Sequence, residues 1–135
     1  MDAILEVSDL RAGYATGDVL QGVSVNVGQG EVVGVLGRNG VGKSTLMRSV
    51  IGLLRARRGT IRFKGRDVTA EGADRRARRG MGYVPQGREI FPHMSVLDNL
   101  RMGRFVNAGG GRFALEEVYG YFPFLKERVR QRGGT

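Results

Sequence analysis

The stretch from Gly37 to Thr45 holds the residues best suited to chemistry in this chain. It matches a phosphate-binding pattern of glycine, four residues, glycine, lysine and serine. Glycines have no Cβ, so such a loop can wrap a polyphosphate and aim backbone N–H groups at its oxygens. Lys43 would place its ammonium between two phosphates, Ser44 would ligate a bridging Mg²⁺, and Thr45 would add a hydrogen bond. The predicted phosphate-binding residues are Gly37, Arg38, Asn39, Gly40, Val41, Gly42, Lys43, Ser44 and Thr45.

The residues on either side of this loop predict the elements that must position it. Glu31 to Leu36 is continuously apolar after its first residue and flanked by glycines, which predicts a central strand covered on both faces of a parallel sheet. After the loop, apolar residues from Leu46 to Leu54 recur at helical spacing. A strand, loop and helix in this order favour a nucleotide site over a coincidental glycine turn. The competing dinucleotide pattern of spaced glycines has no good match here.

Alternating apolar residues predict further strands with one face buried. They occur at Leu5 and Val7, at Val23, Val25 and Val27, and at Ile61 and Phe63, and Met81 to Pro85 indicates one more short strand. Ser95 and Asp98 form a capping-box pattern that predicts a helix to about Arg104. A loop over residues 107–111, a helix over 113–122 and a second helical stretch over 124–131 complete the prediction.

The composition excludes several kinds of site. The 135 residues contain no cysteine and a single histidine, His93, so a disulfide, a zinc–thiolate site, a thiol nucleophile and a multi-histidine metal cluster are excluded. Oxygen ligands must hold any metal. Acidic residues near the amino terminus do not fit an export signal, and no apolar run approaches the length of a membrane span. We therefore expect a cytoplasmic location.

Basic residues outnumber acidic ones, 22 against 13, and the excess is concentrated in one block. From Arg55 to Arg79 there are ten basic and three acidic residues, which supply seven of the nine net positive charges. Such a block can bind nucleic acid or anionic lipid. Only Phe63 is interleaved to stack on bases, so a solvated surface is the favoured interpretation.

Together these residues resemble the ATP-binding subunits of ABC transporters over the whole chain. The family carries an adenine-stacking aromatic at the position of Tyr14, in Leu-Arg-Ala-Gly-Tyr. The stretch Tyr-Val-Pro-Gln ending at Gln86 resembles the family's glutamine loop, which implies that the Gln86 amide oxygen reaches Mg²⁺ and the attacking water. The resemblance thus implies Lys43 and Gln86 as catalytic residues, Ser44 and Gln86 as Mg²⁺ ligands, and ATP as the nucleotide.

The residues around and after Gln86 indicate a subfamily within the ABC ATPases. Pro85 to Pro92, followed by Ser95 to Leu100, is similar to the ATPases of branched-chain amino acid importers of the Liv type and to relatives that drive urea or short amide uptake. In the family this segment faces the membrane subunit. The alternative is a structural loop packed by Phe91 and Leu97. His93 is interpreted as an exposed loop residue, because the family's switch histidine lies much later in the chain.

The family's signature, acidic strand end and switch histidine do not occur in these 135 residues. The resemblance therefore implies an α/β P-loop NTPase of the ABC ATPase type, incomplete, with N-terminal antiparallel strands, part of the parallel core sheet and the start of the helical subdomain. Residues 1–94 would form the core with the phosphate and glutamine loops, and 95–135 the start of the helical subdomain. We expect such an N-terminal part to bind Mg-ATP with negligible turnover, and to self-associate or need a partner because a sheet edge is exposed.

The partners implied by the resemblance are transmembrane permease subunits and a second ATPase subunit. Membrane contact would come only through these partners, at the inner face of the plasma membrane, and no nucleic acid is expected. Three alternatives stay open: an ABC-type ATPase of nucleic-acid or ribosome work, a small self-sufficient P-loop domain, and a remnant without activity.

Overall fold

The computed structural model describes residues 3–87, 89–106 and 115–135. The chain divides into two compact units, Met1–Met81 and Gly82–Thr135. The phosphate-loop residues and Tyr14 belong to the first unit, and Gln86 belongs to the second. The predicted division of one domain at residue 94 stays a prediction.

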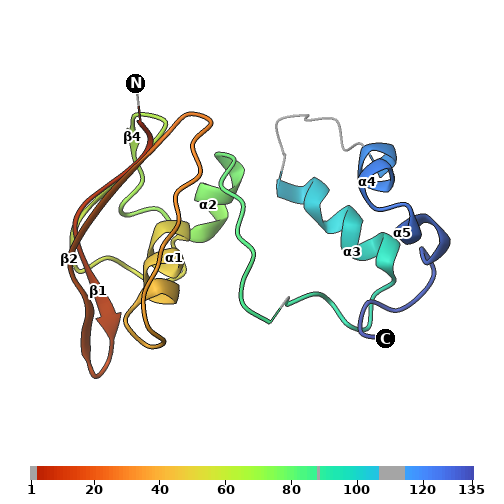
Figure 1. Cartoon of the computed structure of the whole chain (residues 1–135), viewed down its shortest axis with the longest axis horizontal. Helices are drawn as coiled ribbons and strands as arrows, with labels where there is room; N and C mark the ends of the chain where they lie inside the picture. Colours follow the sequence, from red (N-terminus) through yellow and green to blue (C-terminus); the bar gives the residue numbers. More distant parts are fainter. Residues whose placement is uncertain (1–2, 88, 107–114) are drawn as a thin grey trace. The chain divides into compact units, whose positions relative to one another are not determined.

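The first unit is built on a four-stranded antiparallel sheet (Figure 1). Its strands are β1 (Ala3–Tyr14), β2 (Gly17–Gly28), β3 (Arg58–Phe63) and β4 (Arg66–Asp67), in the order β2-β1-β3-β4. Strand β1 pairs with β2 on one side and with β3 on the other. The three strands predicted from alternating apolar residues are therefore confirmed.

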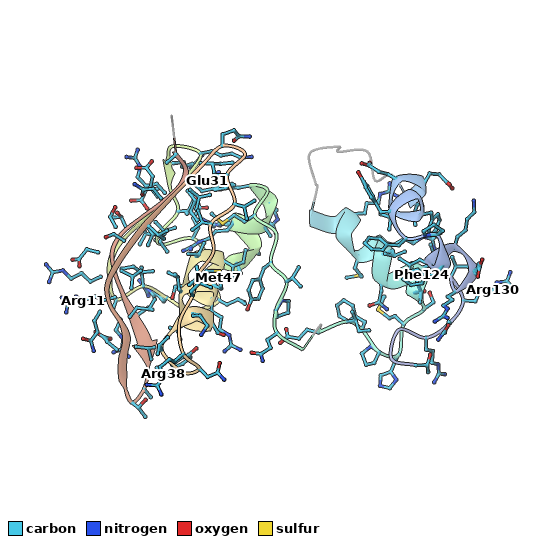
Figure 2. The ribbon with its side chains drawn as sticks, in the orientation of Figure 1. Arg11, Glu31, Arg38, Met47, Phe124 and Arg130 are labelled. Atoms are coloured by element: carbon cyan, nitrogen blue, oxygen red, sulfur yellow. The ribbon has the colours of Figure 1, made fainter. Side chains whose placement is uncertain are left out.

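Helices α1 (Lys43–Ile51) and α2 (Ala73–Arg78) complete the first unit. Figure 1 shows α1 against one face of the sheet, and Figure 2 shows Arg11 of β1 pointing away from that face. The helix predicted after the phosphate loop is confirmed, although it ends at Ile51, where Gly52 takes a left-handed conformation with φ of 88°. The buried apolar side chains are Val7, Leu10, Ala12, Leu20, Leu46, Ile51, Ile61, Phe63, Val68 and Met81.

Two predicted strands are wrong. Residues 31–36 and 81–85 form no strand, and the side chains of Val32 and Leu36 are 96% and 94% exposed. A parallel strand needs ladder partners from other segments of the chain, and none of the described residues pairs with either stretch. The described sheet is consequently antiparallel throughout, and it contains no part of the expected parallel core.

The first helix of the second unit begins after a residue that caps it with its side chain. Helix α3 (Val96–Met102) follows Ser95, whose Oγ accepts a hydrogen bond from the Asp98 backbone N–H at 3.1 Å and donates to Asp98 Oδ2 at 2.6 Å. The predicted capping residue is therefore confirmed. The α-helix ends at Met102 and continues as the 3₁₀ helix η1 (Gly103–Val106).

The last helical prediction is only partly right. Helix α4 (Leu115–Tyr121) confirms the prediction within its bounds, whereas residues 113–114 and the predicted loop at 107–111 lie outside the described residues. Helix α5 (Phe124–Glu127) stops four residues before the predicted end. The backbone beyond it bonds to the start of α3 instead, from Val96 N–H to Gln131 O at 2.8 Å and from Leu97 N–H to Val129 O at 3.1 Å.

One member of the basic block is buried, contrary to its interpretation as a solvated surface. The Arg76 side chain is 1% exposed, and burial lowers the pKa of its guanidinium. It donates to the carbonyls of Ser49 and Val50 in the last turn of α1, both at 2.8 Å. It also donates to Glu71 O at 2.9 Å and Thr69 O at 3.0 Å. Through these four bonds the buried Arg76 side chain ties the end of α1 to the segment after β4.

Replacing Arg76 is expected to destabilise the first unit. In Arg76→Met, four carbonyl groups lose their charged donor, so we expect a loss of about 2 to 4 kcal/mol in the free energy of unfolding. Urea denaturation followed by circular dichroism measures the change. The matched control is Arg75→Met on the same helix, where the side chain is exposed. Equal losses in the two variants would contradict the structural role of Arg76.

The ion pair between Glu71 and Arg79 predicts a dependence of the free energy of unfolding on pH. Arg79 Nε lies 2.6 Å from Glu71 Oε2, and hydrogen bonding from Arg79 is the main cause that lowers the pKa of Glu71. A carboxyl with a lowered pKa stabilises the fold above its ordinary value of about 4.3, and the contribution disappears as the pH falls through the lowered value.

We therefore expect Glu71→Gln to lower the melting temperature at pH 7 and to approach the wild type as the pH falls to 3. Thermal melts across this pH range measure the difference. Asp74→Asn is the control, because Asp74 forms an exposed pair with Arg78 at 3.5 Å. A difference for Glu71→Gln that stays constant from pH 7 to pH 3 would count against the pair.

Candidate nucleotide site

The predicted phosphate loop runs directly into α1. Gly40 and Gly42 have φ angles of 81° and 113°, in the region that favours glycine. Gly42 is the N-cap of α1 and supplies no side-chain cap, and the first turn of the helix contains no acidic residue. The first N–H groups of the helix therefore have no side-chain cap and lie at its positive end, an arrangement that suits an anion.

A side chain at position 42 would crowd its neighbours on β2. A Cβ built there would lie 3.1 Å from Leu20 Cδ2 and 3.2 Å from Val19 Cγ1, both on β2. At Gly37, a Cβ would lie 2.9 Å from Val41 Cγ2 within the loop itself. The glycine at position 42 therefore serves both backbone conformation and the close approach of the loop to β2.

The Lys43 side chain folds back over the loop. Its Nζ donates hydrogen bonds to Gly37 O at 2.5 Å and to Arg38 O at 2.7 Å. These two contacts hold the ammonium beside the loop backbone. A phosphate bound at the start of α1 would therefore meet a positive charge that is already near the uncapped N–H groups.

The other predicted loop residues differ in exposure. The side chains of Arg38, Asn39, Val41 and Ser44 are exposed, and Figure 2 shows where Arg38 lies in the first unit. Thr45 is a residue of α1 with only 6% of its surface exposed, and its predicted bond to a phosphate stays a prediction.

The Ser44 hydroxyl is of the oxygen class that Mg²⁺ prefers, and it lies in the first turn of α1. Among the residues that the structure describes, no group of three or more histidine, cysteine, aspartate or glutamate side chains is arranged to hold a metal ion.

Tyr14 lies in the same unit as the loop. It is the last residue of β1, it pairs with Gly17 across the hairpin, and its side chain is 40% exposed. Val19 and Leu20, a few residues further along β2, are the side chains that border Gly42. The hairpin end that carries Tyr14 therefore adjoins the phosphate loop through β2, which fits the predicted role of the tyrosine.

Gln86 lies in the second unit, where it is exposed in a turn. Its predicted meeting with the phosphate loop stays a prediction. His93 is also exposed, in the turn before α3, which confirms its interpretation as a loop residue.

Sequence reasoning missed two residues with structural contacts, one in each unit. Asn99 of α3 donates to Phe91 O at 2.9 Å and accepts from Phe91 N–H at 2.8 Å, so it holds the turn before α3. In the sequence, the only indication of this role was that Asn99 lies four residues after the predicted capping residue Ser95. Arg57 was counted only as one charge of the basic block, yet it contacts the hairpin end at Tyr14 and Asp18. No local pattern signals that contact, because 39 positions separate Arg57 from Asp18.

The ABC transporter family model matches residues 20–133 of the chain. The chain belongs to the ABC transporter family. This stretch includes the phosphate loop, Gln86 and the described helices of the second unit. It does not include residues 1–19, which contain β1 and the start of β2, or the last two residues.

Two curated relatives match most of this chain but only about half of their own length. The high-affinity branched-chain amino acid transport ATP-binding protein BraG of Pseudomonas aeruginosa is 37% identical over 123 residues, which cover 90% of this chain and 53% of BraG. The lipopolysaccharide export system ATP-binding protein LptB of Acidithiobacillus ferridurans is 44% identical over 100 residues, 74% of this chain and 42% of LptB. The chain thus spans about half the length of these relatives.

The solved structures agree on the fold. An ATP-binding subunit of an ABC transporter superposes with a TM-score of 0.81 at 30% identity, over 96% of this chain and 54% of that one. A nucleotide-free ATP-binding cassette gives 0.78 at 26% identity, over 98% and 58%. The ABC ATPase fold class is therefore confirmed. Among the described residues, none of the helices has the length and apolar character needed to cross a membrane.

The geometry of Gly42 predicts a cost for any side chain there. Gly42→Ala combines a left-handed φ with crowding against β2, so we expect a loss of about 1 to 2 kcal/mol in unfolding free energy. Gly34→Ala is the control, because a Cβ at Gly34 would meet no atom within 4 Å. Chemical denaturation compares the two. Equal stability of both variants would contradict the close approach of the loop to β2.

Proposed function

We propose that this chain is the ATP-binding part of a subunit that couples ATP binding and hydrolysis to transport across a membrane. The observation that carries the proposal is the uncapped start of α1, with Gly40 and Gly42 in left-handed conformation and the Lys43 ammonium beside the loop. This arrangement offers backbone N–H groups and a cation to a polyphosphate. Tyr14, exposed at the neighbouring hairpin end, would stack on the adenine.

We assign the metal-binding role to oxygen ligands. Ser44, exposed in the first turn of α1, and Gln86, exposed in its turn, would hold Mg²⁺ together with the phosphates. The ion would neutralise charge on the phosphate oxygens. Lys43 would add a second positive charge at the same phosphates, and Gln86 would orient the attacking water.

We propose branched-chain amino acids as the transported substrate. The similarity to BraG over 90% of the chain supports this choice, as does the stretch from Pro85 to Leu100. The similarity to LptB over 74% of the chain supports a second candidate, export of lipopolysaccharide, and uptake of urea or short amides is a third. Genes for the matching permease subunits beside the coding sequence would distinguish them.

The proposed partners are permease subunits in the membrane and a second ATPase subunit. The second unit offers the surface for the permeases, because Ile90 and Phe91 are 47% and 49% exposed. The chain would then lie at the inner face of the plasma membrane through these partners alone.

Nucleotide binding tests the central proposal. We expect the 135-residue chain to bind Mg-ATP, and Lys43→Ala to weaken binding at least about tenfold because a phosphate loses its charged donor. Isothermal titration measures both affinities. Lys64→Ala is the matched control, since it removes the same charge from an exposed side chain on the same unit. Equal binding by wild type and Lys43→Ala would refute the site.

The same preparations test turnover. We expect steady-state phosphate release by the 135 residues to be no faster than that of Lys43→Ala, because the base, signature and switch residues of the family do not occur among them. Faster release by the wild-type chain would show that these residues suffice for hydrolysis.

A further inference from the structure

Arg57 joins three points at one end of the β1–β2 hairpin. Its backbone N–H donates to Arg11 O at 2.8 Å. In its side chain, Nη1 lies 2.7 Å from Asp18 Oδ1 on β2, and Nη2 donates to Tyr14 O on β1 at 2.7 Å. One guanidinium therefore bridges both strands of the hairpin where they leave the rest of the sheet.

The bridge covers a gap in the strand pairing. The ladder between β1 and β3 runs from Leu5 to Arg11, which pairs with Arg58, so it ends three residues before Tyr14. Beyond that point β1 has only β2 as a neighbour, and the β1–β2 register shifts between Ala12 and Gly13. Arg57 directly precedes β3 in the chain. Its side chain contacts the end of β1 where β3 no longer pairs with that strand.

The position of the hairpin end decides where the Tyr14 ring lies. A two-stranded ribbon without a third strand twists and bends more freely than the sheet it leaves. By holding Tyr14 O and the Asp18 carboxylate together, the planar guanidinium restricts this movement. Asp18 is followed by Val19 and Leu20, which border Gly42 of the phosphate loop.

We propose that Arg57 is a positioning residue that sets the Tyr14 ring relative to the phosphate loop and so controls recognition of the nucleotide base. The inference rests on the proposed function, in which Tyr14 stacks on adenine. Arg57 does not touch the nucleotide in this proposal, and its charge is matched by Asp18. Its removal should therefore alter the contribution of the base and leave that of the phosphates.

The neighbouring arginine provides a matched control. The Arg58 side chain is 72% exposed, and its Nε lies 3.7 Å from Asp9 Oδ2. Arg58→Gln removes the same charge one position along the chain and leaves the hairpin bridge intact. A loss caused only by reduced positive charge would therefore occur in both variants.

The test compares binding of Mg-ATP with binding of magnesium tripolyphosphate, which has phosphates but no base. Stacking of one base on an aromatic ring accounts for roughly a five- to hundredfold gain in affinity. We expect Arg57→Gln to weaken Mg-ATP about fivefold and to change tripolyphosphate affinity less than twofold. Asp18→Asn, which keeps Arg57 but weakens the bridge, should act in the same direction, so the test survives if Arg57→Gln fails to fold.

A double-mutant cycle separates positioning from general stability. Once Tyr14→Ala has removed the ring, adding Arg57→Gln should change Mg-ATP affinity less than twofold. The inference is overturned if Arg57→Gln weakens both ligands equally, if it matches Arg58→Gln, or if it still weakens Mg-ATP fivefold without the Tyr14 ring. A wild-type chain that binds neither ligand, or a Lys43→Ala variant that binds both as well as wild type, overturns the proposed function and this inference together.

Discussion

The first unit depends on a buried guanidinium that has carbonyl oxygens for partners. Arg76 holds the last turn of α1 through Ser49 and Val50, and it holds the segment after β4 through Thr69 and Glu71. A buried cation without these four acceptors would be costly, so burial is possible only when helix and segment are both in place. The positive charge also lies at the negative end of α1, where it is favoured. The N-terminal end of α1 directly follows the phosphate loop.

Sheet and loop constrain each other at the other end of α1. Gly42 approaches β2 so closely that a side chain there would crowd Val19 and Leu20. The same strand returns through Asp18 to the hairpin end that carries Tyr14. Tyr14 and the residues that border the phosphate loop thus belong to the two strands of one hairpin, and Arg57, which directly precedes β3, contacts both strands. The arrangement combines a helix start that borders β2 with a hairpin end that one side chain bridges.

Much of this was predictable from local sequence. The glycines, Lys43 and Ser44 occur at fixed spacing because the loop chemistry requires those residue types in that order, and the hairpin strands alternate because one face is buried. The Ser95 cap was predictable for the same reason. The strand over 31–36 was not, since its apolar residues indicate a covered position but say nothing of which segment pairs with it. None of the described residues does so, and Val32 and Leu36 remain exposed.

The sequence by itself indicated the family and predicted a phosphate-binding loop, because that pattern lies within nine consecutive residues and the local elements beside them. Only the tertiary structure decided which arginines matter. Ten basic residues between Arg55 and Arg79 look alike in sequence, yet folding buries Arg76 among carbonyls and places Arg57 beside Tyr14 and Asp18. Arg76 contacts Val50 across 26 positions of sequence, and Arg57 contacts Tyr14 across 43. No local pattern records such contacts, because each depends on where the whole sheet brings its strands together.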